Sequence, residues 1–142
     1  MIRTLLLLIL SVVLSASTQK IEQEIFQTII EGLFPHKRVV NVWSDDPQKK
    51  SLLASIAKVS IVAKPEDADI LFLKKIHEKL PKKALIFAVD YRTLKAYREK
   101  AVGGFYWQKG RPNLVFFNRE LHSRHIRLPK EMHKYIDRGE RL

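Results

Sequence analysis

Three aspartates stand where a parallel sheet would place a ligand. Asp45 and Asp46 directly follow segment 39–43, a short β-branched run that we expect to be a strand. Asp90 likewise follows the apolar segment 84–89. Open α/β sheets bind ligands outside the carboxyl ends of their strands, and adjacent carboxylates there can bind a cation. These aspartates are our candidate ligand site, with helix caps and a turn as the more ordinary alternative.

The densest group of recognition-type side chains surrounds a Lys-Gly-Arg-Pro sequence. Its members are Trp107, Lys109, Arg111 and Asn113. Aromatic and arginine side chains dominate interface hot spots because they bury a large area and still offer hydrogen-bond donors, so we expect this group to bind a partner protein. Stacking on nucleic-acid bases does not fit the export that is predicted below. The alternative is a β-hairpin turn whose aromatic residues alternate into the core.

Three histidines near the carboxyl terminus could hold a metal. His122 and His125 are three residues apart, on one side of any helix, and His133 is close in sequence. Neutral imidazoles at this spacing bind Zn²⁺ or Cu²⁺. Several Lys and Arg residues in the same segment oppose cation binding, so surface histidines are the reading that we favour.

No catalytic motif stands out. The chain lacks a glycine-rich phosphate loop, a G-x-S-x-G nucleophile elbow and an H-E-x-x-H zinc motif. It has no Cys, which excludes disulfides, thiolate catalysis and sulfur-ligated metal sites. We therefore expect a protein with neither enzymatic activity nor a cofactor.

The amino-terminal segment predicts where the protein works. Arg3 and the terminal amine form a short positive region, residues 5–14 form an apolar run, and small residues surround Ala16. This order is that of a secretory signal peptide, and the apolar run is shorter than the ~20 residues of a spanning helix. We expect cleavage near Ala16 to leave one exported domain, residues 17–142. An uncleaved membrane anchor is the alternative.

The order of apolar patterns predicts the fold class. A helix is expected over residues 18–34, where apolar residues recur every three or four positions. Strands and helices then alternate. The expected strands are 39–43, 58–62, 70–73, 84–89, 105–107 and 114–117, and the expected helices follow Asp46, Leu73, Asp90 and Pro129. This order predicts an α/β sandwich of two or three layers, with a largely parallel sheet that ends in a β-hairpin.

Two further segments carry specific expectations. The basic segment 74–80 is expected to form the short helix after Leu73. Gly103-Gly104 precedes a strand rather than a helix, so we expect it to give backbone freedom at a strand start instead of binding phosphate.

Charge is distributed unevenly along the chain. The net charge is +11, with 26 Lys and Arg residues against 15 Asp and Glu. Residues 17–73 hold seven basic and eight acidic residues, a net −1, whereas residues 74–142 hold eighteen and seven, a net +11. We expect one face or end to meet an acidic partner, a polyanion or an anionic membrane surface. A solvated surface that only aids solubility is the alternative.

The chain resembles a known family at several short motifs. Gly103-Gly104 precedes a hairpin strand, Gly110-Arg111 forms a turn, and a strand that ends at Asn118 leads to a short helix. Further matching positions are Leu121, Ile126, Arg127, Leu128 and Met132. Together they resemble the carboxyl-terminal signature of YfiR-like periplasmic proteins. Upstream, 42–47 resembles the family's strand with two aspartates and a proline, and 69–72 resembles its third strand.

The resemblance implies a non-enzymatic regulator. YfiR-like proteins lie in the periplasm, often as dimers, and bind the sensor part of an inner-membrane diguanylate cyclase, so that an envelope signal controls cyclic-di-GMP. A histidine kinase partner would look the same from this sequence. Family disulfides cannot form here because the chain has no Cys. The alternative function is a periplasmic module that binds a small anion or amphiphile near Asp45 and Asp90.

Overall fold

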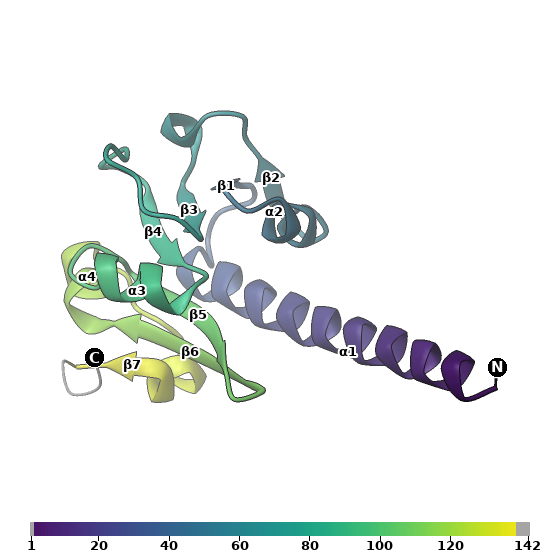
Figure 1. Cartoon of the computed structure of the whole chain (residues 1–142). Helices are drawn as coiled ribbons and strands as arrows, with labels where there is room; N and C mark the ends of the chain where they lie inside the picture. The colour runs from purple at the N-terminus through teal and green to yellow at the C-terminus, as the bar shows by residue number, and fades with distance from the viewer. Residues whose placement is uncertain (1, 139–142) are drawn as a thin grey trace.

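The chain folds into alternating helices and strands (Figure 1). The computed structural model describes the backbone of residues 2–138 and the side chains of residues 17–138. Its elements are α1 (Ile2–Leu33), β1 (Val40–Ser44), α2 (Pro47–Ala54), β2 (Val59–Ile61), η1 (Pro65–Asp67), β3 (Ile70–Leu73), β4 (Leu85–Ala88), α3 (Tyr91–Tyr97), β5 (Gly103–Gln108), β6 (Arg111–Phe117), α4 (Asn118–Ser123), η2 (Lys130–Tyr135) and β7 (Ile136–Asp137), where η1 and η2 are 3₁₀ helices. The predicted α/β class is confirmed.

All the strands of the described chain join one sheet, in the order β2-β1-β3-β4-β5-β6-β7. The first five of these are parallel to their neighbours, and β6 runs antiparallel to β5. The largely parallel sheet with a hairpin is therefore confirmed. β7 adds a short strand beyond the hairpin, parallel to β6, directly after the helical segment that follows Pro129.

Helices cover both faces of this sheet, which makes three layers. Alternate residues of a strand point to opposite faces: Ile70 and Phe72 pack in one cluster, and Leu71 and Leu73 pack in another. Residues of α1, α2, α4 and η2 belong to the first cluster and residues of α3 to the second. α2 and α3 lie on opposite faces because the chain moves across the sheet in opposite directions, from β1 to β2 and from β4 to β5. A right-handed connection places its helix on one face for the first direction and on the other face for the second.

α1 is longer than the helix that the periodicity predicts. It runs from Ile2 to Leu33 and passes the expected start at residue 18 without a break. The predicted signal peptide therefore falls within α1. Met1 lies outside the described residues, and only the backbone of residues 2–16 is described, so cleavage near Ala16 stays a prediction. The carboxyl-terminal half of α1 is fully buried on its sheet side, at Phe26, Ile29 and Ile30.

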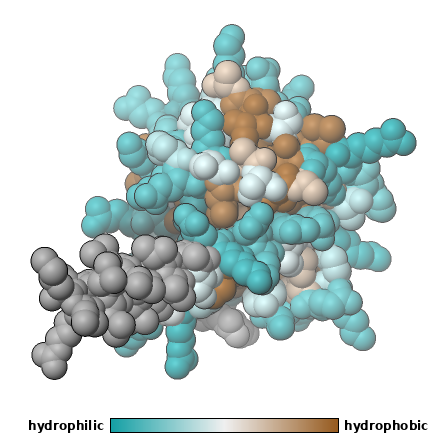
Figure 2. Space-filling model, turned by 90° about the vertical axis from the view of Figure 1, so that its right-hand side faces the viewer, coloured by the Kyte–Doolittle hydropathy of each residue, from teal (hydrophilic) through white to brown (hydrophobic). Residues whose placement is uncertain are grey.

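β2 is one edge of the sheet in the described chain. Figure 2 shows the molecule from this side, where apolar side chains reach the surface among hydrophilic ones. β2 is only three residues long. The half-buried Lys58 precedes it and the exposed Lys64 follows it. Short edge strands with flanking charges resist pairing with another chain, so this edge is a poor candidate for partner binding.

Gly103-Gly104 serves close packing and not the backbone freedom that we expected. Gly110 is the only described glycine with a positive φ. A Cβ on Gly103 would lie 2.3 Å from the main-chain oxygen of Val115, and a Cβ on Gly104 would lie 2.5 Å from Leu94 Cδ1. The two glycines therefore let β5 approach both β6 and α3.

Gly103→Ala is expected to destabilise the fold by about 2 kcal/mol, because the added methyl group meets a main-chain oxygen and the strands must separate. Gly32→Ala is the control: its methyl group meets the flexible end of the Met132 side chain, at 2.5 Å from Sδ, so we expect a loss below about 1 kcal/mol. Urea unfolding followed by circular dichroism measures both. Equal losses of stability in the two variants would contradict the conclusion that Gly103 is needed for the close approach of β5 to β6.

Candidate functional site

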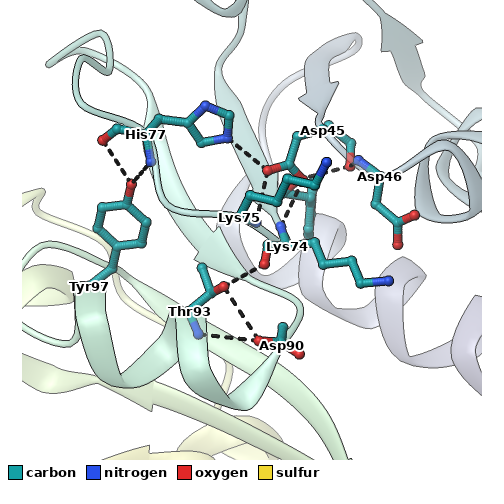
Figure 3. Close-up of polar contacts among 10 residues, drawn as sticks. Asp45, Asp46, Lys74, Lys75, His77, Asp90, Thr93 and Tyr97 are labelled. Atoms are coloured by element: carbon teal, nitrogen blue, oxygen red, sulfur yellow. Dashed lines mark hydrogen bonds and ion pairs between the residues drawn. The ribbon is translucent and has the colours of Figure 1, made fainter.

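The three predicted aspartates come together at the carboxyl edge of the sheet. They follow β1 and β4 and line one cavity of about 810 Å³. The other lining residues are Pro47, Lys74, Lys75, Ile76, Tyr91, Arg92 and Thr93. β3 lies between β1 and β4 in the sheet, and Figure 3 shows Lys74 and Lys75, which follow β3, between Asp45 and Asp90. The topology thus brings the aspartates to one place, as the sequence predicts.

Asp45 is a structural anchor rather than a free ligand. Its carboxylate accepts hydrogen bonds from the main-chain N–H groups of Lys74, at 2.7 Å, and Lys75, at 2.9 Å. It also lies 2.7 Å from Nε2 of His77, and its side chain is 6% exposed (Figure 3). All three contacts reach the loop that follows β3. Asp45 therefore ties the end of β1 to that loop.

Asp46 and Asp90 cap helices, which confirms the more ordinary reading of both. Asp46 accepts a hydrogen bond from the N–H of Gln48, at 3.3 Å, and Pro47 begins α2. Asp90 accepts one from the N–H of Thr93, also at 3.3 Å, and begins α3. Both are in extended backbone, as N-cap residues are.

The loop between β3 and β4 is ordered without forming the helix expected over 74–80. Tyr97 accepts a hydrogen bond from the N–H of His77 and donates one to its carbonyl oxygen, at 2.6 and 3.1 Å. The Arg124 guanidinium donates to the carbonyl oxygens of Lys82 and Lys83, both at 2.9 Å. Tyr97 of α3 and Arg124, which directly follows α4, thus satisfy main-chain groups of this loop that have no partner in a regular helix.

The second predicted site lies at the end of the β5–β6 hairpin. Lys109 and Gly110 form its turn with φ values of 51° and 73°, which is the sign pattern of a type I′ turn. Lys109 and Arg111 are exposed, and Trp107 is 37% exposed. Asn113 is half-buried and donates to the main-chain oxygen of Arg111, at 3.1 Å. The four predicted residues therefore do share one structural unit.

Trp107 also joins this hairpin to the helical layer. Its indole N–H donates to Glu22 of α1, at 2.7 Å. The same carboxylate forms an ion pair with Lys49 of α2, at 2.8 Å. Trp107 lies edge-on to the buried Phe105, with ring centroids 6.0 Å apart. Glu22 thus connects α1, α2 and β5.

The three histidines do not gather into a metal site. His122 and His125 are exposed, and His133 places Nε2 3.0 Å from the main-chain oxygen of Leu128. Among the described residues, no group of three His, Cys, Asp or Glu side chains could hold a metal ion.

Several residues that organise these sites carry no sequence signal of their own. Glu22, His77, Tyr97 and Arg124 act through partners at least twenty residues away. The sequence predicts a helix over Lys74 and Lys75, but both residues lie in a loop and line the cavity. Both lysines directly follow an apolar strand, as Asp45 directly follows β1. This shared position at the carboxyl edge of the sheet is the signal that could have identified them.

None of the helices, within the part of the chain that the structure describes, has the length and apolar character needed to cross a bilayer. Comparisons with protein-family models, with curated proteins and with solved structures give no match to this chain.

Proposed function

We propose that this protein is an exported, non-enzymatic signalling regulator, and that it binds the sensor domain of an inner-membrane diguanylate cyclase or histidine kinase. The free end of the β5–β6 hairpin would make the contact. The proposal rests on the resemblance to YfiR-like proteins and on one observation, the exposure of an anchored aromatic and basic hairpin beyond the rest of the sheet.

The hairpin extends past its neighbours on both sides. β4 pairs with β5 only at Gly103 and Gly104, and β7 pairs with β6 only at Phe116 and Phe117. Residues 105–115 therefore have no further strand beside them in the described chain. At the end of the hairpin, residues 107–112 are exposed and open to a partner, whereas Phe105 is buried and residues 113–115 are half-buried.

The composition of this end favours a side-chain contact over strand addition. Trp107 and Pro112 form the pair next to the Gln108–Arg111 pair that closes the turn. In that position main-chain groups point away from the partner strand, so Pro112 leaves no N–H donor at the outer edge. Exposed Trp and Arg side chains, in contrast, are the types that supply most interface binding energy.

The hairpin is also held in place before it binds. The Trp107–Glu22 hydrogen bond fixes β5 against α1, and the Lys49–Glu22 ion pair is largely buried, with side chains 16% and 12% exposed. A preorganised surface loses less conformational entropy on binding. The basic charge of the turn would orient an acidic partner and increase the association rate.

The elements that the resemblance implies are present in the expected order. α1 is followed by β1 and its two aspartates, β5 begins at Gly103-Gly104, and α4 follows β6 at Asn118. This order of elements supports the proposal that the chain is a YfiR-like protein. The periplasmic location and the tendency to dimerise are parts of the same proposal.

Arg111→Ala is expected to weaken capture of the partner about tenfold or more without lowering the melting temperature, because Arg111 is exposed and its side chain forms no ion pair with any described residue. The measurement is cross-linking and affinity capture of the tagged, exported protein, followed by mass spectrometry. Recovery of an inner-membrane sensor with a cyclase or kinase output domain supports the proposal.

Arg127→Ala is the matched control, since Arg127 is also an exposed arginine in the basic half of the chain. We expect capture to be unchanged in this variant. Equal loss in both variants would mean that general charge, and not the hairpin, attracts the partner. A lower melting temperature with unchanged capture would make Arg111 structural.

A further inference from the structure

The cavity at the carboxyl edge lies at the point where the strand order reverses. β1 is followed in the chain by β2 on one side, and the chain then returns to β3 on the other side. Doubly wound sheets bind ligands in the crevice that such a reversal opens. The volume of about 810 Å³ is within the range of small-molecule sites, roughly 300–1,000 Å³.

Three cationic side chains line this cavity without an ionic partner. They are Lys74, Lys75 and Arg92. In the described residues, none of them has a carboxylate within 4.0 Å. Both carboxylate oxygens of Asp45 accept main-chain N–H groups, and Asp46 and Asp90 each accept one N–H through a single oxygen. The carboxylates therefore already have main-chain donors, whereas the three cations are the groups that can pair with an anionic ligand.

The backbone that carries these lysines is fixed by other side chains. Asp45 accepts the N–H groups of both lysines, and the Thr93 hydroxyl donates to the carbonyl oxygen of Lys74. Figure 3 shows Lys74 extending from this point between Asp46 and Asp90. Binding groups on a fixed backbone need less ordering when a ligand arrives.

Two exposed apolar residues complete the lining. Ile76 is 61% exposed and Tyr91 is 41% exposed, and both line the cavity. Cations beside an aliphatic and an aromatic surface suit an organic anion better than an inorganic ion, because the apolar part of the ligand gains contact area.

We propose that this cavity binds a small organic phosphate. Lys74, Lys75 and Arg92 contact the phosphate group, and the apolar part of the ligand lies against Ile76 and Tyr91. The site is separate from the partner-binding hairpin, and the inference does not depend on the proposed regulatory function. Tyr91 packs against Tyr106 of β5, with ring centroids 4.9 Å apart, so one residue of the cavity lining is in contact with the base of the hairpin.

The test is calorimetric titration of the purified protein with phenyl phosphate and, separately, with inorganic phosphate. We expect saturable binding of phenyl phosphate and weaker binding of inorganic phosphate. The double variant K74Q/K75Q should raise the Kd of phenyl phosphate at least about tenfold, since it removes charge-assisted hydrogen bonds. Ile76→Ser should weaken phenyl phosphate binding about threefold and leave inorganic phosphate unchanged.

The matched control is K50Q/K64Q, which removes the same two charges from exposed lysines outside the cavity. Its Kd should stay within about twofold of the unmodified protein. Equal weakening in the two double variants would overturn the site, because it would show a general effect of net charge. Failure of phenyl phosphate to bind at millimolar concentration would also overturn it.

Discussion

Phe26→Ala is expected to destabilise the folded protein by about 4 kcal/mol. Phe26 is fully buried and comes from α1, whereas the rings around it come from the sheet. Its centroid lies 5.4 Å from that of Phe72 and 5.5 Å from that of Phe105, in both cases edge-on. Phe87 of β4 lies slightly farther away, at 6.4 Å. Removal of the Phe26 ring would leave a cavity between the helix and these three strands that the closely packed neighbours cannot fill.

Urea unfolding followed by tryptophan fluorescence measures this loss. Phe26→Leu is the control, because leucine keeps most of the volume and we expect it to lose only about 1.5 kcal/mol. If Phe26→Ala lowered the free energy of unfolding no more than Phe26→Leu does, α1 would not be an integral part of the core. Since domains of this size have a total stability of about 5–15 kcal/mol, the predicted loss is a large fraction of it.

The fold class could be predicted because its signals are local. The Asp46-Pro47 junction marks a helix start by side-chain chemistry and fixed φ alone. The uninterrupted apolar segment before Asp90 indicates a strand that is covered on both faces, and all of β4 is buried. Elements that depend on residues adjacent in the chain could therefore be predicted from the sequence.

Distant hydrogen bonds explain where the sequence misled. The segment 74–80 has lysines and leucine, which favour a helix, but Asp45 and Tyr97 bind its main chain in another conformation. β7 was missed because two residues are too few to show a period of two. The full length of α1 was missed because the apolar run of a signal peptide and a helix look alike.

The candidate site was predicted in place but not in detail. The aspartates could be located because each follows an apolar strand. That Lys74 and Lys75 line the same cavity depends on pairing β1 with β3, which lie about thirty residues apart. The contact between Trp107 and Glu22 spans 85 residues, and no local pattern contains it.

Asp45→Ala is expected to destabilise the protein by about 3 kcal/mol, since it leaves two N–H donors and His77 without their acceptor in a site where the carboxylate is 6% exposed. Urea unfolding gives the free energy. Amide hydrogen exchange gives the location: the N–H groups of Lys74 and Lys75 should exchange faster, while those of β4 should change only with global stability.

Asp46→Ala is the matched control, because the two aspartates are adjacent and the sequence cannot distinguish them. Asp46 caps one helix through a hydrogen bond of 3.3 Å to Gln48, and losing a cap costs about 1 kcal/mol. Asp45 joins β1 to the loop after β3, so its loss should be about 2 kcal/mol larger. Equal losses would mean that capping is the main role of both residues. The excess at Asp45, together with faster exchange at Lys74 and Lys75, would instead identify Asp45 as the residue that positions the lysines of the cavity.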